Sequence, residues 1–335
     1  MPANVLIAVN RELFPTLFSK MDLDRLHGIA RVLPVEPPVD ADRDFLLEHA
    51  GEADVVISSW GTARVDAEVL AKADRLKLVC HAAGSVRPVV SEALWERKVR
   101  VTSSAAAIAY GVAEFTLGLL LSCSKRVPWF GVGTRQGYWQ EPQASFGGAF
   151  EIYQQNIGII GAGHIGRILI RLLKSFTCQV LVYDPYLSAG EAEKLGVRKV
   201  DELEELFSTC RAVTLHAPTH ENTRHMLRGH HFAALQKGSL FINTAGSIQI
   251  HEEEFLAELR KGNFVACIDR CNLEPVEQDH PYRHLPNVLL TPHIAGVIAE
   301  NRLRIGTMVV DEIEQLINGG AFFHEVTLED LAKMA

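Results

Sequence analysis

Residues 156–184 read NIGIIGAGHIGRILIRLLKSFTCQVLVYD, and this stretch decides the fold. The apolar run Ile157–Ile160 predicts a buried strand, and the helical spacing of apolar residues from Ile165 onward predicts a helix with one apolar face. A second apolar run, Val180–Tyr183, predicts another strand, which ends at Asp184. Strand, glycine turn, helix, strand and acid in this order are typical of a domain that binds a dinucleotide.

The turn between the first strand and the helix carries three glycines, and their spacing has a physical reason. Gly161 lets the chain leave the strand sharply, Gly163 lets the backbone approach a pyrophosphate, and Gly166 lets the helix pack against the strand. The helix N-terminus would offer free N–H groups and a partial positive charge to the phosphates. Asp184 follows Gly166 by 18 residues, where a carboxylate can accept the two hydroxyls of an adenosine ribose and repel a 2′-phosphate. We therefore predict NAD as the cofactor; the alternative is a glycine-rich turn without a ligand.

Length and composition favour a soluble protein of two domains. The chain has 335 residues, which is enough for about two domains of roughly 150 residues, and its hydrophobic content of 47% can fill two cores. The net charge of −8, without a long basic run, disfavours nucleic-acid binding. The first apolar run, Val5–Val9, is too short for a signal peptide, and the longest membrane-like stretch, around Phe115–Cys123, is well below the roughly 20 residues of a membrane span. We expect a cytoplasmic protein that binds neither nucleic acid nor membrane.

Cysteine and histidine residues give little support for a metal site. The six cysteines form no CxxC pair and lie mostly in apolar runs, which predicts reduced, buried thiols. Cys267 and Cys271 could be half of a metal site, but no matching second pair follows. A cluster of histidines in a polar helical stretch predicts solvated side chains, and its members are His220, His225, His230 and His231. We therefore predict that the protein binds no metal.

Strands and helices alternate along the first 104 residues, which predicts one α/β unit with a parallel sheet. The predicted strands are 5–9, 54–58, 76–81 and 99–102, and the predicted helices are 45–50, 65–73 and 91–97. A long apolar helix is expected over 107–125, and residues 129–155 are expected to form an extended loop.

The alternation resumes after Asp184 and predicts a six-stranded doubly wound domain that begins with Ile157–Ile160. The further predicted strands are 212–216, 239–243, 264–269 and 288–290, and the further helices are 201–207, 229–235 and 251–261. The tail, 297–318, predicts a long helix that Gly319 and Gly320 end, and we expect it to pack on the first domain.

Three further stretches are 235–262, 266–275 and 285–296, and they contain NTAGS, NLEP and TPHIAG. Together with GAGHIG and the position of Asp184, they resemble the NAD-dependent D-isomer-specific 2-hydroxyacid dehydrogenases, over nearly the whole chain. The resemblance implies an α/β fold in which a doubly wound Rossmann coenzyme domain, 105–297, is inserted into a smaller flavodoxin-like substrate-binding domain. That second domain would use 1–104 and 298–335.

The resemblance also implies what the protein binds. It implies NAD as the cofactor, a small substrate that carries a carboxylate, and a homodimer through the coenzyme domains. The connecting helix that holds Glu114, and the loop after it, would lie at the dimer contact.

Two residues match the family's catalytic pair, His293 in TPHIAG and Glu274 in NLEP. Histidine suits proton transfer because its unperturbed pKa lies near neutrality, and a carboxylate beside the ring would orient it and favour its protonated form. The resemblance implies cofactor contacts at Gly161, Gly163, His164, Ile165, Gly166, Asp184, His216, Ala217, Pro218, Asn243, Thr244, Ala245 and Asp269. It implies substrate contacts in the loop Ala82–Val86, at Ala83, Gly84 and Ser85, and we add the following Arg87 as a candidate.

The sequence departs from the family at one important position. In the family an arginine follows Asn-Thr-Ala and grips the substrate carboxylate, whereas this chain has Gly246 there. Arg87, Arg270 and Arg64 are candidates to replace it, although each is also typical of a surface arginine. Trp60 and His81, at the ends of predicted strands, are candidates to line the cleft.

Three functions stay open. The protein is a dehydrogenase of a small 2-hydroxy or 2-oxo acid, a reductase of a different carbonyl compound, or an NAD(H)-binding regulatory protein with little or no turnover. If the wild type lacks a carboxylate clamp, installing arginine at position 246 is expected to raise kcat/KM for 2-oxo acids.

Overall fold

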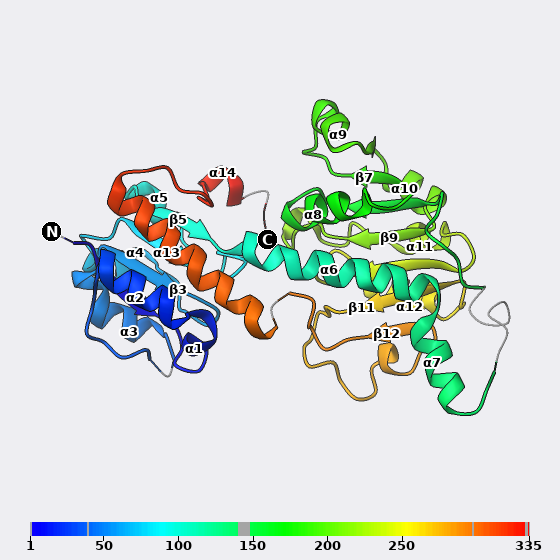
Figure 1. The fold of residues 1–335 in the computed structure, drawn as a ribbon, viewed down its shortest axis with the longest axis horizontal. Helices are drawn as coiled ribbons and strands as arrows, with labels where there is room; N and C mark the ends of the chain where they lie inside the picture. The colour runs from blue at the N-terminus through cyan, green and yellow to red at the C-terminus, as the bar shows by residue number, and fades with distance from the viewer. Residues whose placement is uncertain (1, 39, 140–147, 297, 332–333, 335) are drawn as a thin grey trace. The chain divides into compact units, whose positions relative to one another are not determined.

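The computed structural model describes residues 2–38, 40–139, 148–296, 298–331 and 334. The chain forms two compact units, one from residues 1–108 and 297–335, and the other from residues 109–296. Each unit is built on a parallel β-sheet that carries helices on both faces (Figure 1). The prediction of two α/β folds is confirmed.

The first unit holds a five-stranded sheet in the order β2-β1-β3-β4-β5, which is the strand order of flavodoxin-like folds. Its strands are β1 Asn4–Ala8, β2 Arg31–Val32, β3 Val55–Ser58, β4 Leu78–His81 and β5 Arg100–Ser103. Its helices are α1 Phe14–Leu17, α2 Lys20–Ile29, α3 Arg43–His49, α4 Ala67–Lys72, α5 Ala93–Glu96, α13 Leu303–Asn318 and α14 Leu328–Leu331, with 3-10 turns at Ala50–Glu52 and Ala299–Arg302.

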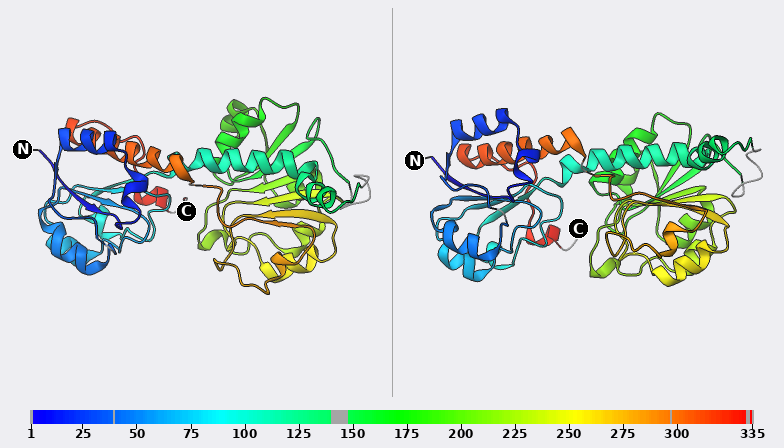
Figure 2. Two further views of the ribbon diagram at one scale, coloured as in Figure 1. Left: turned by 60° about the horizontal axis from the view of Figure 1, so that its bottom comes forward. Right: turned by 90° about the horizontal axis from the view of Figure 1, so that it is seen from below.

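Apolar residues alternate between the two faces of this sheet, so both faces are covered. One face packs against α3, α4 and α5, and the other packs against α2 and α13. Helix α13 lies beside α2 (Figure 2), where Arg25 donates to Asp311 at 2.7 Å and to Glu314 at 2.6 Å. The tail helix therefore packs on the first unit, and it ends at Gly319 in the left-handed conformation, as predicted.

The second unit holds a seven-stranded parallel sheet in the order β12-β11-β10-β9-β6-β7-β8. This is the doubly wound order of dinucleotide-binding folds, with one strand added at an edge. Its strands are β6 Asn156–Ile160, β7 Gln179–Tyr183, β8 Arg198–Val200, β9 Ala212–Leu215, β10 Ser239–Asn243, β11 Phe264–Ile268 and β12 Val288–Leu290. Its helices are α6 Ala105–Ser124, α7 Val127–Arg135, α8 His164–Leu173, α9 Ala189–Leu195, α10 Leu203–Thr209, α11 Gly229–Ala233 and α12 Glu252–Leu259, with 3-10 turns at Glu221–Thr223 and Pro281–Arg283.

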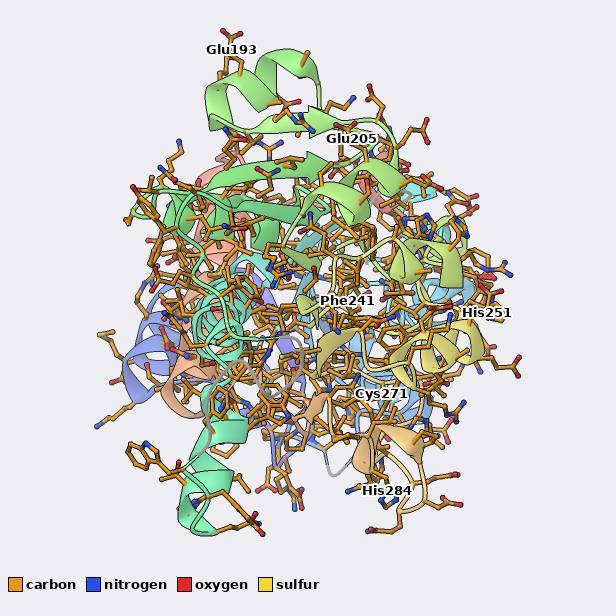
Figure 3. The ribbon with its side chains drawn as sticks, turned by 90° about the vertical axis from the view of Figure 1, so that its right-hand side faces the viewer. Glu193, Glu205, Phe241, His251, Cys271 and His284 are labelled. Carbon is orange, nitrogen blue, oxygen red and sulfur yellow. The ribbon has the colours of Figure 1, made fainter. Side chains whose placement is uncertain are left out.

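Two apolar cores cover the two faces of the second sheet. Helices α10, α11 and α12 pack on one face, where Phe241 is fully buried among aromatic rings, while α6, α8 and α9 pack on the other. Phe241 lies inside this unit in Figure 3, and Glu193 and Glu205 lie at its surface. The approach of α10 is close, because a Cβ on Gly158 would lie 2.3 Å from Leu206.

Several expectations about the elements were wrong. The first sheet has five strands, because β2 adds to the predicted four. The second sheet has seven strands, because β8 adds to the predicted six, and it follows helix α9, which was also missed. Residues Val127–Arg135 form helix α7, where a loop over 129–155 was predicted, and Pro128 suits the first turn of this helix. Residues 140–147 of the predicted loop lie outside the described residues. Helix α2 was missed as well, although Ser19 and Asp22 form a capping box at its start.

Helix α6 corrects the expectation about membrane-like segments. It is long and apolar enough, by length and composition alone, to cross a membrane, and it is the one such helix among the described residues. Ala113, Leu120 and Cys123 of α6 are buried in the core that covers the second sheet. These three side chains therefore serve the core of the second unit, while Tyr110 and Leu121 of the same helix are exposed.

Candidate active site

The glycine turn lies at the carboxyl end of β6, where the packing leaves no room for a side chain on Gly161 or on Gly166. A Cβ on Gly161 would lie 2.8 Å from the backbone of His216, and one on Gly166 would lie 2.1 Å from the Gly161 carbonyl oxygen. A Cβ on Gly163 would meet nothing within 4 Å, and no side chain caps helix α8 there. An open helix N-terminus above a tight turn fits the pyrophosphate of a dinucleotide.

Asp184 and His216 flank this turn. Asp184 accepts the Ala162 N–H through Oδ2 at 2.7 Å and the Tyr186 N–H through Oδ1 at 2.8 Å, so its carboxylate is fixed beside the turn. His216 Nε2 lies 2.9 Å from Thr214 Oγ1, and Nδ1 has no partner among the described residues. Burial lowers the pKa of His216 to about 3, so the ring is neutral.

His293 and Glu274 meet beyond the carboxyl ends of β12 and β11. His293 Nδ1 lies 2.8 Å from Glu274 Oε2, and the ring is about half exposed. Partial burial raises the pKa of Glu274, but the hydrogen bond from the Cys271 amide and the charges of Arg270 and His293 outweigh it, so this pKa lies below its ordinary value. Glu274 is therefore ionised at neutral pH and faces the histidine as a carboxylate.

Asp269 anchors the loop that carries His293. Its Oδ1 accepts from Thr291 Oγ1 at 2.6 Å and from the Ile294 N–H at 3.0 Å, and its Oδ2 accepts from the Ala295 N–H at 3.0 Å. These bonds hold His293 at a φ of +53°, which few residues other than glycine adopt. The sequence suggested Asp269 only as a cofactor contact, and it gave no signal for Thr291 as its partner.

Arg270 extends this group of charges. Its Nε donates to Glu274 Oε1 at 3.2 Å, and the Cys271 N–H donates to the same oxygen at 2.9 Å. Glu274 thus accepts from Arg270 through one oxygen and contacts His293 through the other. Of the three arginines proposed to replace the one absent at Gly246, Arg270 is the one that contacts the predicted catalytic pair.

The segment after β10 runs beside Arg270. Asn243 Nδ2 donates to the Gly246 carbonyl at 2.7 Å, and Ser247 Oγ donates to the Arg270 carbonyl at 2.8 Å. A Cβ on Gly246 would lie 2.6 Å from Thr219 Oγ1. Position 246 is therefore closed to a side chain in this backbone.

This geometry changes the expected result of installing the family's arginine. Gly246→Arg must displace Thr219 from its hydrogen bond with Gln249, so we expect a loss of about 1–3 kcal/mol in the free energy of unfolding, as is usual for overpacking. We also expect no gain in kcat/KM for 2-oxo acids. Urea unfolding and steady-state kinetics would test both, and a stable variant with tenfold higher kcat/KM would contradict this reading.

The predicted substrate loop lies in the first unit, after β4. Its carbonyl oxygens accept hydrogen bonds from within the first unit. Ser59 Oγ donates to the Ala82 carbonyl at 2.9 Å, the Ser104 N–H donates to the Ala83 carbonyl at 3.0 Å, and Ser103 Oγ donates to the Gly84 carbonyl at 2.6 Å. The amides of Ala83, Gly84 and Ser85 donate to no acceptor in the part of the chain that the structure describes. Three successive amides without an acceptor suit the binding of an anion.

The other candidates from the first unit are engaged elsewhere. Arg87 donates through its guanidinium to the carbonyls of Leu331 and Met334, and Arg64 donates to the carbonyl of Arg87 at 3.4 Å. His81 is buried beside Ser58 Oγ at 3.0 Å, and burial lowers its pKa to about 4. His81 therefore lies in the core of its unit, while Trp60 is partly exposed.

Of the predicted solvated histidines, His225 and His230 are exposed, whereas His231 is not. His231 is buried, and its ring lies with that of His230 and with Glu204 in a group whose ligand atoms are within 4.8 Å of one another. However, His231 Nδ1 accepts the Arg228 N–H at 2.9 Å, so in the neutral ring Nε2 carries the proton and faces Glu204. Both ring nitrogens are then in use, and the ring acts as a helix cap for α11.

The chain belongs to the D-isomer specific 2-hydroxyacid dehydrogenase family, because residues 117–295 match the family's NAD binding domain. The predicted family and its cofactor, NAD, are thereby confirmed.

Similar proteins extend this match over most of the chain. D-3-phosphoglycerate dehydrogenase of Methanocaldococcus jannaschii is 31% identical over 297 residues, which are 88% of this chain and 56% of that protein. Hydroxypyruvate reductase of Thermotoga maritima is 30% identical over 275 residues, which are 81% of this chain and 87% of that protein. Among solved structures, the TT0316 protein from Thermus thermophilus has a TM-score of 0.77 and 28% identity, and the match covers 97% of this chain and 100% of that one. The chain spans about half the length of the phosphoglycerate dehydrogenases that it matches.

Proposed function

We propose that this protein transfers a hydride between NAD(H) and C2 of a small 2-hydroxy or 2-oxo acid. The observation that carries the proposal is the 2.8 Å contact between His293 and Glu274, which lies beyond the carboxyl ends of the strands of a doubly wound sheet. Folds of this kind bind their ligands at the carboxyl ends of their strands. The relatives are named for phosphoglycerate, hydroxypyruvate and glyoxylate, and each of these compounds is a small acid with oxygen on the carbon beside the carboxylate.

In this proposal His293 moves the proton. NAD(H), when bound, supplies or accepts the hydride. Glu274 is ionised and accepts from Nδ1, so Nε2 is the ring atom left to face the substrate oxygen. The protonated ring would donate to the oxygen during ketone reduction, and the neutral ring would accept the proton during alcohol oxidation. Glu274 would orient the ring throughout.

The cofactor contacts are proposed on the geometry of the second unit. The open N-terminus of α8, with Gly163, His164 and Ile165, would receive the pyrophosphate, and Asp184 would accept the ribose hydroxyls with its remaining lone pairs. We place the nicotinamide end near His216, Pro218, Thr244 and Asp269, which follow strands β9, β10 and β11. Within the first unit, the amides of Ala83, Gly84 and Ser85 are proposed as an anion-binding group, and Arg87 is a weaker candidate because carbonyls already occupy its guanidinium.

We expect the protein to prefer NADH over NADPH. The Asp184 carboxylate would repel a 2′-phosphate, and Arg167, the nearby cation after the glycine turn, is paired with Glu191 at 2.9 Å. KM values for the two cofactors with any 2-oxo acid that turns over would test this. Equal or better use of NADPH would show that Asp184 does not face the ribose.

The second candidate is an NAD(H)-binding protein with weak or no turnover, and Gly246 favours it because the family's carboxylate-binding arginine is absent. A reductase of a carbonyl compound without a carboxylate would also be consistent with that loss. An assay of NADH oxidation with a panel of 2-oxo acids and of neutral aldehydes separates all three. Turnover restricted to the acids supports the proposed function.

We further propose a cytoplasmic homodimer formed through the second unit. Helices α6 and α7 and the residues after them expose large apolar side chains, which a second copy would cover, and these are Leu121, Val127, Val132, Tyr138 and Trp139. Light scattering of the purified protein would give the mass in solution. A monomeric mass at micromolar concentration would contradict the dimer.

A further inference from the structure

We propose that Arg270 binds the carboxylate of the substrate and so replaces the arginine that the family carries at the position of Gly246. The inference rests on the proposed function and names the group that selects a 2-oxo acid at this site. It uses only residues of the second unit, which lie at the carboxyl ends of the neighbouring strands β10 and β11.

Positions 246 and 270 are neighbours in the backbone. Asn243 Nδ2 donates to both carbonyl oxygens, to Gly246 at 2.7 Å and to Arg270 at 3.4 Å. Ser247 Oγ also donates to the Arg270 carbonyl at 2.8 Å. Both positions follow the carboxyl ends of strands, position 246 after β10 and position 270 after the neighbouring β11. An arginine at position 270 therefore starts one strand away from where an arginine at position 246 would start.

The guanidinium of Arg270 is held at one end and open at the other. Its Nε donates to Glu274 Oε1 at 3.2 Å, while Nη1 and Nη2 donate to no acceptor among the residues that the structure describes. The side chain is 37% exposed, so a small molecule can reach it. Two parallel terminal N–H groups are the geometry that binds a carboxylate through both of its oxygens.

The position of this free end suits the reaction. Glu274 contacts Arg270 through one oxygen and His293 through the other, so a single carboxylate fixes the guanidinium and the proposed proton donor together. In a 2-oxo acid, the carboxylate and the reacting carbonyl are on adjacent carbons. A side-by-side cation and histidine match that pair of groups, whereas a carbonyl compound without a carboxylate would leave Arg270 without a partner.

Binding of oxamate, an unreactive analogue of a 2-oxo acid, to the protein–NADH complex tests the inference directly. We expect Arg270→Ala to weaken oxamate binding by about a hundredfold, since two charge-assisted hydrogen bonds are lost. Arg270→Lys keeps a charge beside Glu274 but loses the planar fork, so we expect it to remain impaired by about tenfold. Arg198→Ala is the matched control. Arg198 lies on the edge strand β8, far from β11 in the order of the sheet, and pairs there with Glu205 of α10, so this variant should bind oxamate like the wild type.

The outcomes separate this inference from the proposed function. Wild-type affinity in Arg270→Ala, or no oxamate binding by the wild type, would overturn the role of Arg270. Full recovery in Arg270→Lys would overturn it too, because Arg270 would then act only by holding Glu274. If Arg270→Ala has normal turnover of 2-oxo acids, the proposed function stands and the inference fails. If oxamate binding depends on Arg270 but no 2-oxo acid turns over, the binding site stands and the proposed function fails.

Discussion

Replacing His293 by alanine is expected to lower kcat by about a hundredfold to ten-thousandfold, the usual range for the loss of a general acid or base. The ring contacts Glu274 at 2.8 Å, is about half exposed, and stands on a loop that Asp269 fixes, so it is free to reach a substrate oxygen. NADH affinity should stay within a few-fold of the wild type, because the pyrophosphate would be held at the glycine turn. Steady-state kinetics and a fluorescence titration of NADH measure the two quantities separately.

Glu274→Gln is the companion variant. It can keep a hydrogen bond to the ring but removes the carboxylate charge beside it, so both the rate of reduction and its pH profile should change. A large loss of NADH affinity in His293→Ala, with kcat nearly unchanged, would mean that the ring holds the cofactor or the loop. An unchanged pH profile in Glu274→Gln would remove Glu274 from the mechanism.

Replacing Asp269 by alanine is expected to have the second large effect, on stability as well as on activity. The carboxylate is buried and accepts three hydrogen bonds from the loop that carries His293, namely from Thr291 Oγ1 and from the amides of Ile294 and Ala295. A buried donor left without an acceptor costs about 1–3 kcal/mol, and of these three hydrogen bonds the one from Ala295 is buried and the other two are part-buried. We therefore expect the free energy of unfolding to fall by about 3 kcal/mol. Activity should fall to the level of His293→Ala, because the ring loses its position.

Urea unfolding followed by circular dichroism measures this loss of stability. Thr291→Val is a milder control, since it removes one of the three donors and keeps the carboxylate. If Asp269→Ala unfolds like the wild type and only its NADH affinity falls, Asp269 serves the cofactor and does not anchor the loop.

Sequence reasoning located the fold because its signals are local and strong. A few residues are enough to recognise the glycine turn after Ile160 and the acid, Asp184, after the next strand. The structure brings the two together at the carboxyl ends of β6 and β7. Strand β8 and helix α9 were missed because their exposed residues carry no apolar period, although Ser188, Glu191 and Gly196 cap that helix. Helix α7 was missed because its two glycines are typical of a loop.

The site was predictable only in part. The resemblance named His293 and Glu274, and their contact agrees with the expected pairing of the two side chains. The contacts of Asp269 with the next loop depend on the packing of β11 beside β12, and no spacing in the sequence encodes them. The closure of Gly246 by Thr219 likewise joins residues that are distant in sequence, so the gain expected from installing arginine there could not be judged from the chain alone.

The most direct test of the central claim follows the hydride itself. The wild-type protein is incubated with NADH that carries deuterium at both positions of the nicotinamide C4 and with a panel of small 2-oxo acids. The products are separated by chiral chromatography and identified by mass spectrometry. The proposed function predicts a D-2-hydroxy acid with one deuterium on C2. Stoichiometric NADH binding with no labelled hydroxy acid from any member of the panel would contradict it.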